Sequence, residues 1–246
     1  MKLYKYRGAA NFDRDLQSII ENRFWASKLE DLNDPSEALY NVDNLRREAN
    51  FGLKLFDFFK LTKFDNQKVE ILIDAQVKLV ELFKTYGVYS LSKNNLNELM
   101  WAHYSEGHKG FCVEYDFETL EDLDIKYNSK EKYLKTQVHL LKTNYSQNIY
   151  KIDSMVINQD HRIIINSLFG NKSKCWAYED EMRIITGLPG NQGYDERCLK
   201  SIIFGFKMHP EHKDKMINNL SKRGINFYQV SRKVDSYQLF LEKIKV

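Results

Sequence analysis

Short segments in which apolar and polar residues alternate occur toward both ends of the chain, with longer helical patterns between them. Strands are predicted at about residues 3–7, 24–27, 88–91, 110–116, 181–186, 201–206, 226–230 and 237–241. Strands that gather at the two ends disfavour a parallel βαβ array, in which strands and helices alternate. We therefore expect residues 1–246 to form a single α+β domain with a mixed or antiparallel central sheet, N-terminal helices and a helical insertion at about residues 117–170.

The helices are predicted from apolar residues that recur every three to four positions. Asn11 is expected to cap a first helix that starts at Phe12. The broadest apolar stripe predicts a helix over about residues 68–84, which ends before Gly87. Further helices are expected at the positions that follow: about residues 44–59, about residues 130–168, and a basic helix that begins at Pro210.

Composition limits the class of protein. Of 246 residues, 43% are hydrophobic and 29% are charged, which is ordinary for a globular protein. The three cysteines form no Cys-x-x-Cys pair, which favours reduced thiols over a disulfide framework or a zinc site. No apolar run approaches the ~18 residues of a membrane span and no signal peptide is evident, so a cytoplasmic protein is expected. A net charge of +3 is too small to imply nucleic-acid binding by itself.

Two predicted strands contain polar residues that a plain core or surface pattern does not require. Arg7 ends the first strand before a glycine and presents a permanently charged fork suited to phosphate, although a surface ion pair is the other interpretation. Ser90 and Ser92 point to one face of a strand, with Tyr89 and Leu91 on the other. Two small hydroxyls would let a flat ligand approach the sheet closely, or else they belong to an exposed polar face.

A third segment places two carboxylates on one strand face. Glu179 and Glu181 share a face if the backbone is extended. Carboxylates so close repel one another, which raises one pKa or recruits a cation. Arg183 falls on the same face, and a structural ion pair that neutralises the carboxylates is the alternative interpretation.

A fourth segment, residues 100–110, combines aromatic residues with two histidines. His103 and His108 are five residues apart, which is a poor spacing for two ligands on a helix, and we expect no metal site there. The turn around Asp34 is predicted either to cap a following helix or to form a loop at the rim of a cleft. No glycine-rich dinucleotide motif, P-loop, nucleophile elbow or HExxH motif is present.

Taken together, these segments resemble a large bacterial family known only as a domain of unknown function. The blocks that carry the resemblance run nearly from end to end: LYKYR, FWAS, LNDPSE, YSLS, MWAHYSEGHKGFCVEYD, WAYEDEMRI and IIFG. That family in turn resembles the arginine–serine–glutamate branch of the ADP-ribosyltransferase superfamily. In that branch an Arg on the first strand precedes a Ser-x-Ser strand and then a Glu-x-Glu strand. This chain matches those positions in the same order. Arg7 matches the first strand, Ser90 and Ser92 match the second, and Glu179 and Glu181 match the third.

The resemblance implies an NAD-dependent ADP-ribosyltransferase or NAD glycohydrolase, of the kind found among toxins and phage-defence effectors. Cleavage of the nicotinamide–ribose bond passes through an oxocarbenium-like state, which negative charge near the ribose stabilises. By resemblance, Glu181 would bind the ribose hydroxyl and Glu179 would orient or deprotonate an acceptor. Arg7 would hold the pyrophosphate, and Ser90 would fix the nicotinamide–ribose end, with Ser92 as a further residue that binds NAD. Tyr104 is preferred to Tyr89 for stacking on nicotinamide, because strand parity places Tyr89 on the other face.

Two other functions fit parts of the pattern. A magnesium-dependent nuclease would use Asp34, Glu37, Glu179 and Glu181 as metal ligands, with the lysine-rich helices on the phosphates. A non-catalytic binding module would use the carboxylates and Arg183 as a structural network. The acceptor in the first hypothesis is open: a protein, a nucleic acid, a small molecule or water.

Overall fold

The computed structural model describes residues 1–36, 66–117, 138–149 and 161–246. The strands are β1 (Lys2–Arg7), β2 (Arg23–Ala26), β3 (Gly87–Ser92), β4 (Phe111–Asp116), β5 (Val138–Lys142), β6 (Asn144–Ser146), β7 (Asn171–Ser173), β8 (Glu181–Thr186), β9 (Gly190–Gly193), β10 (Leu199–Phe204), β11 (Asn226–Arg232) and β12 (Leu239–Ile244). The α-helices are α1 (Phe12–Ile20), α3 (Asn66–Phe83), α4 (Glu98–Tyr104), α5 (His161–Phe169) and α6 (Pro210–Leu220). Short 3₁₀ helices are η1 (Leu29–Asp31), η4 (Lys174–Glu179), η5 (Glu196–Cys198) and η6 (Ser221–Arg223).

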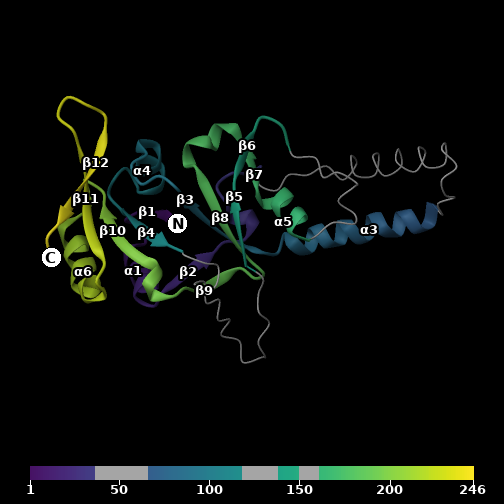
Figure 1. Cartoon of the computed structure of the whole chain (residues 1–246), viewed down its shortest axis with the longest axis horizontal. Helices are drawn as coiled ribbons and strands as arrows, with labels where there is room; N and C mark the ends of the chain where they lie inside the picture. Colours follow the sequence, from purple (N-terminus) through teal and green to yellow (C-terminus); the bar gives the residue numbers. More distant parts are fainter. Residues whose placement is uncertain (37–65, 118–137, 150–160) are drawn as a thin grey trace.

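Eight of these strands form one sheet in the order β12-β11-β10-β4-β1-β3-β8-β5 (Figure 1). Every neighbouring pair is antiparallel except β10 and β11, which run parallel. The sheet takes strands from both ends of the sequence, as one α+β domain requires. The predicted fold class, α+β with a mostly antiparallel central sheet, is confirmed.

The predicted helical insertion needs correction. Residues 138–146, expected to be helical, form β5 and β6 instead. β5 pairs antiparallel with β8 and ends the large sheet, so hydrogen bonding to a neighbouring strand outweighed a local helical pattern. Of the predicted insertion at about residues 117–170, α5 is helical as expected, and residues 118–137 and 150–160 lie outside the described residues. The helix expected at about residues 44–59 also lies outside them.

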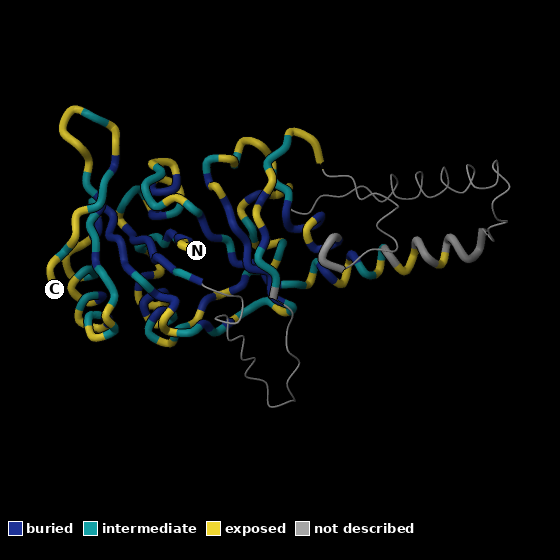
Figure 2. The backbone as a smooth tube through the Cα atoms, viewed as in Figure 1, coloured by how far each residue is buried: buried dark blue, intermediate teal, exposed yellow. Residues whose placement is uncertain are grey.

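Helices cover parts of both faces of the sheet. On one face α1 and α6 pack on β3, β4 and β10, where Leu16 and Met216 are buried in the largest apolar cluster. On the other face α4 buries Trp101 against β1 and β4. A third cluster joins α3 and α5 to β5 and β8, and α3 extends away from the sheet beyond it (Figure 1). Figure 2 shows the buried residues concentrated along the central strands. None of the described helices combines the length and hydrophobicity that a membrane crossing requires.

The centre of the sheet contains a local separation between two neighbouring strands. β1 pairs with β4 along its whole length, from Lys2↔Asp116 to Arg7↔Phe111. On its other side it meets β3 at a single register position, Tyr4↔Ser92. Farther along, β3 makes a bridge to the segment after β2 instead, at Ser27↔Val88. The edge of β3 between these two contacts is therefore open to side chains from β1 and β2.

Candidate functional site

A cavity of about 880 Å³ lies at this separation, against the open edge of β3. Its lining includes residues from both faces of the sheet and Glu181 from β8, so the cavity extends from the separation across β3. All six residues predicted to form the site line it: Arg7, Ser90, Ser92, Tyr104, Glu179 and Glu181. They come from β1, β3, α4, η4 and β8, which are far apart in sequence. The structure brings these residues together; their roles remain predictions.

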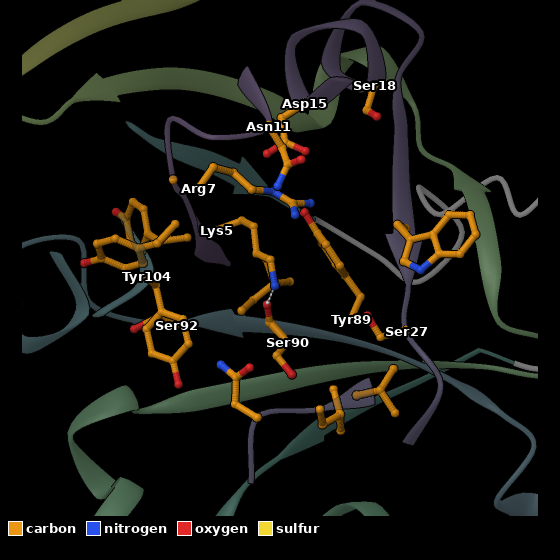
Figure 3. A pocket seen from close by; sticks show the side chains of 18 of the residues that line it. Lys5, Arg7, Asn11, Asp15, Ser18, Ser27, Tyr89, Ser90, Ser92 and Tyr104 are labelled. Carbon is orange, nitrogen blue, oxygen red and sulfur yellow. Dashed lines mark hydrogen bonds between the residues drawn. The ribbon is translucent and has the colours of Figure 1, made fainter. Parts of the chain in front are cut away.

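Tyr89 also lines this cavity, which corrects an argument made from the sequence. Strand parity was expected to place Tyr89 away from the site, and it does lie on the face opposite Ser90. The open edge of β3 nevertheless admits both residues (Figure 3). The Tyr89 ring stacks on Phe24 at 4.3 Å between centroids, and burial raises the pKa of its hydroxyl. That hydroxyl is buried and forms no hydrogen bond of acceptable geometry, although Arg7 lies beside it.

Two cations of β1 occupy the middle of the cavity. Lys5 donates from Nζ to the Ser90 carbonyl oxygen at 2.8 Å, across the separation of the strands, and lies 4.8 Å from the centroid of the Tyr89 ring. Burial, with a contribution from the positive charge of Arg7, lowers the pKa of Lys5 to about 7. Arg7 lies with Cζ 6.0 Å from the same centroid. Nearby, Asp15 pairs with Arg14 at 3.0 Å.

Within the described part of the chain, Arg7 has no carboxylate within 4.0 Å, so the surface ion pair considered from the sequence is not found. Its guanidinium lines the cavity, where the negative charge of Asp15 and the Tyr89 hydroxyl act on it, and a fork of this kind can also bind an anion. Lys5 was missed as a site residue. The signal was present in the strand alternation, because Lys5 and Arg7 share a face with the buried Leu3. A basic residue on a core-facing strand position needs either a partner or a cavity.

Glu181 lies at the opposite side of β3 from this separation, where its Cα faces Ser92. It accepts two hydrogen bonds from Arg183, Nε to Oε1 at 3.0 Å and Nη2 to Oε2 at 2.9 Å. Lys172 approaches Oε2 at 3.3 Å. Burial would raise the pKa of Glu181, but Arg183, Lys172 and the hydroxyl of Ser90 together lower it to about 2. Glu181 is therefore ionised at neutral pH, although it is only 3% exposed.

Glu179 has different partners. It accepts a hydrogen bond from the Tyr104 hydroxyl and one from Lys172 Nζ at 2.6 Å. Burial raises the pKa of Glu179 in spite of these partners. Lys172, which also lies 5.0 Å from the ring centroid of Trp176, thus bridges the two carboxylates. Sequence reasoning missed Lys172, because β7 is too short to show a pattern.

The ion pair between Arg183 and Glu181, one of the two interpretations of this segment, is confirmed. Arg183 is fully buried and also donates from Nη1 to the Phe169 carbonyl at 2.9 Å. Two carboxylates and two cations thus form one buried network at this end of the cavity. Ser92 is buried as well, and its hydroxyl bonds to the backbone N–H and C=O of Asn94, which ties the turn after β3.

The metal hypothesis gains no support from the described residues. They contain no group of three or more His, Cys, Asp or Glu side chains that could hold a metal ion. Asp34 accepts from the Ser36 backbone N–H at 2.9 Å and does not line the cavity, and Glu37 lies outside the described residues. The neighbouring Asn33 does line the cavity, as the cleft-rim interpretation of this turn predicts. His108 is stacked between Trp101 and Phe206.

Comparison with known protein families finds a match for one segment of this chain. Residues 100–184 match the family described as "Protein of unknown function (DUF2971)". The matched segment runs from α4 into β8 and contains Tyr104, Glu179 and Glu181, but not β1 or β3. No curated protein and no solved structure matches the chain.

Proposed function

We propose that this protein cleaves the nicotinamide–ribose bond of NAD, as an ADP-ribosyltransferase or an NAD glycohydrolase. The observation that carries the proposal is the convergence of Arg7, Ser90, Tyr104 and both glutamates on one cavity. Its volume of about 880 Å³ lies within the usual range of roughly 300–1,000 Å³ for ligand pockets.

The charges in the cavity suit this reaction. When the bond breaks, nicotinamide leaves as a neutral molecule with the bonding electrons, and positive charge develops on the ribose. An ionised carboxylate beside the ribose stabilises that charge. Glu181 has the required ionisation, because Arg183 and Lys172 hold its pKa well below neutrality. Ser90 is close enough to contribute to that lowering, so both can contact the same sugar.

Glu179 is suited to the second half of the reaction. Its raised pKa makes it a stronger base than an exposed glutamate, and Tyr104 fixes its orientation. It would accept the proton of the incoming nucleophile while that nucleophile bonds to the ribose. With water as the acceptor the product is ADP-ribose; with a protein or nucleic acid it is an ADP-ribosylated macromolecule.

The test is an assay of nicotinamide release from NAD by the purified protein. We expect Glu181→Gln to reduce release by at least about a hundredfold, in the range seen when one electrostatic group is removed from an active site. Glu211→Gln is the matched control, because Glu211 is 87% exposed and lies outside the cavity. Circular dichroism of each variant establishes that it is folded at the assay temperature. Equal turnover by Glu181→Gln and the unchanged protein would refute the assigned role.

One observation favours a second candidate, a non-catalytic module that binds a nucleotide. Both carboxylates are paired with cations, Lys172 and Arg183, so the net charge of this network is close to zero. A site of this kind can position a sugar without stabilising a cation on it. This alternative predicts that NAD binds and is recovered intact, with no nicotinamide released after prolonged incubation.

A further inference from the structure

The cavity continues beyond the groups that the proposed chemistry uses. At its other end it is lined by Trp25 of β2 and Asn191 of β9. Trp25 is 58% exposed, whereas its strand neighbours Phe24 and Ala26 are buried in the core. A large exposed aromatic side chain at the rim of a cavity is a suitable platform for a flat ring.

The amide of Asn191 stands beside this indole. Trp25 and Asn191 occupy directly opposite positions in the antiparallel pair of β2 and β9, so their side chains project from the same face. A carboxamide offers both a donor and an acceptor, which is the combination that the edge of a nucleobase can use. The pair therefore provides a stacking surface and a hydrogen-bonding group for one planar, polar ring.

The two ends of the cavity are ordered along β3. Ser92 marks the end with the carboxylates, since its Cα faces Glu181, and Val88 marks the other end through its bridge to Ser27. Figure 3 shows Lys5 between Ser92 and Tyr104 on one side and Ser27 on the other. Val88 and Ser92 are four positions apart on an extended strand, a distance of about 13 Å at 3.3 Å per residue.

Two basic side chains of β1 lie between the two ends. Lys5 bonds to the Ser90 carbonyl, in the middle of β3, and Arg7 lies over Tyr89. The cavity thus presents an aromatic platform, then the permanently charged Arg7 with the amine of Lys5, whose pKa is about 7, and then carboxylates. The parts of a dinucleotide follow the same order: a base, a diphosphate, and a ribose that carries the leaving group.

We infer that Trp25 stacks on the adenine ring of the bound dinucleotide, with Asn191 at the edge of the ring. The inference rests on the proposed function, because that function places the reacting ribose at the carboxylate end and so leaves the adenosine half for the end at Trp25. A further consequence concerns ligand specificity. The cavity should bind ligands that contain adenosine more tightly than ligands that lack it.

The test compares the affinities of AMP, NAD and nicotinamide mononucleotide, measured by isothermal titration calorimetry. Because stacking of a base on an aromatic side chain contributes about 1–3 kcal/mol, Trp25→Ala should weaken AMP and NAD binding by about tenfold or more. Nicotinamide mononucleotide, which lacks adenine, should change by less than about twofold. Trp25→Phe should retain most of the affinity. Tyr237→Ala, at an aromatic residue that is 81% exposed and outside the cavity, is the matched control and should bind all three ligands normally.

Three outcomes would overturn the inference: unchanged AMP and NAD affinity in Trp25→Ala, an equal loss for all three ligands, or no binding of AMP by the unchanged protein. The result is separable from that of the catalytic test. AMP binding that depends on Trp25, without nicotinamide release, would retain the adenine site and reject NAD cleavage. Nicotinamide release with unchanged NAD affinity in Trp25→Ala would retain the catalysis and reject the adenine site.

Discussion

Replacing Glu181 with glutamine should destabilise the protein by an amount that depends on pH. The substitution keeps the size of the side chain but removes the negative charge that Arg183 and Lys172 contact. In the folded protein the pKa of Glu181 is about 2, against an ordinary value of 4.5. A difference of about 2.5 units corresponds to about 3 kcal/mol at neutral pH, at 1.36 kcal/mol per unit.

An independent argument gives a similar magnitude. Arg183 is fully buried, and Glu181→Gln leaves its guanidinium without the carboxylate that it contacts twice. Removing one partner of a buried ion pair typically costs about 3–5 kcal/mol. For a chain of this length, 3 kcal/mol corresponds to a decrease in melting temperature of about 6 °C.

The sign of the pH dependence follows from the direction of the shift. Because folding lowers the pKa of Glu181, its contribution is fully present above about pH 4.5 and is lost as the pH falls toward 2. Urea unfolding at pH 7, 5 and 3.5 should therefore show a difference between wild type and Glu181→Gln that is largest at pH 7 and smallest at pH 3.5. Glu211→Gln, at an exposed position in the first turn of α6, loses a contact with His209 and a favourable helix-end charge and should lower stability by no more than about 1 kcal/mol at any of these pH values. A difference that stays constant over this range would show that the ion pair is not its source.

Two further substitutions test other parts of the structure. Gly110→Ala should prevent stable folding or lower stability by more than about 3 kcal/mol, because the new Cβ would lie 1.8 Å from the backbone oxygen of Arg7; a variant with the wild-type melting temperature would contradict this geometry. Lys5→Met should flatten the pH dependence of stability between about pH 7 and 10. Burial lowers the pKa of Lys5 to about 7, so in this range the unfolded chain still binds a proton that the folded chain has released, and wild-type stability rises with pH. Equal slopes in denaturant titrations of the two proteins would exclude a buried amine.

Much of the sheet could be predicted from local pattern alone. The alternation of apolar and polar residues located β4 and β8, and the apolar stripe before Gly87 located α3. The apolar stripe of α3 follows the side that packs against the core. β4 and β8 are buried along almost their whole length, so their polar residues are buried as well. Residues 138–146 were assigned wrongly because β5 and β6 adopt their conformations through pairing with β8 and β7, which are distant in the sequence.

Several residues that line the cavity could also be named from the sequence, but the geometry of the cavity could not be predicted. Spacing and residue type identified Arg7, Ser90 and Glu181, and all three line the cavity. Strand parity correctly placed Tyr89 and Ser90 on opposite faces of β3, but it did not indicate that both residues line the cavity, because parity assumes a continuous sheet.

The sequence by itself thus determined which residues are chemically unusual for their positions, and where most of the strands and helices lie. Only the tertiary structure decided that β1 and β3 separate after one register contact, that Lys5 spans the gap, and that Lys172 bridges the two glutamates. The physical reason is that the spacing of apolar residues in a segment reports only which side of that segment is buried. Where two strands part, and which distant charges then meet, depends on the packing of the whole chain.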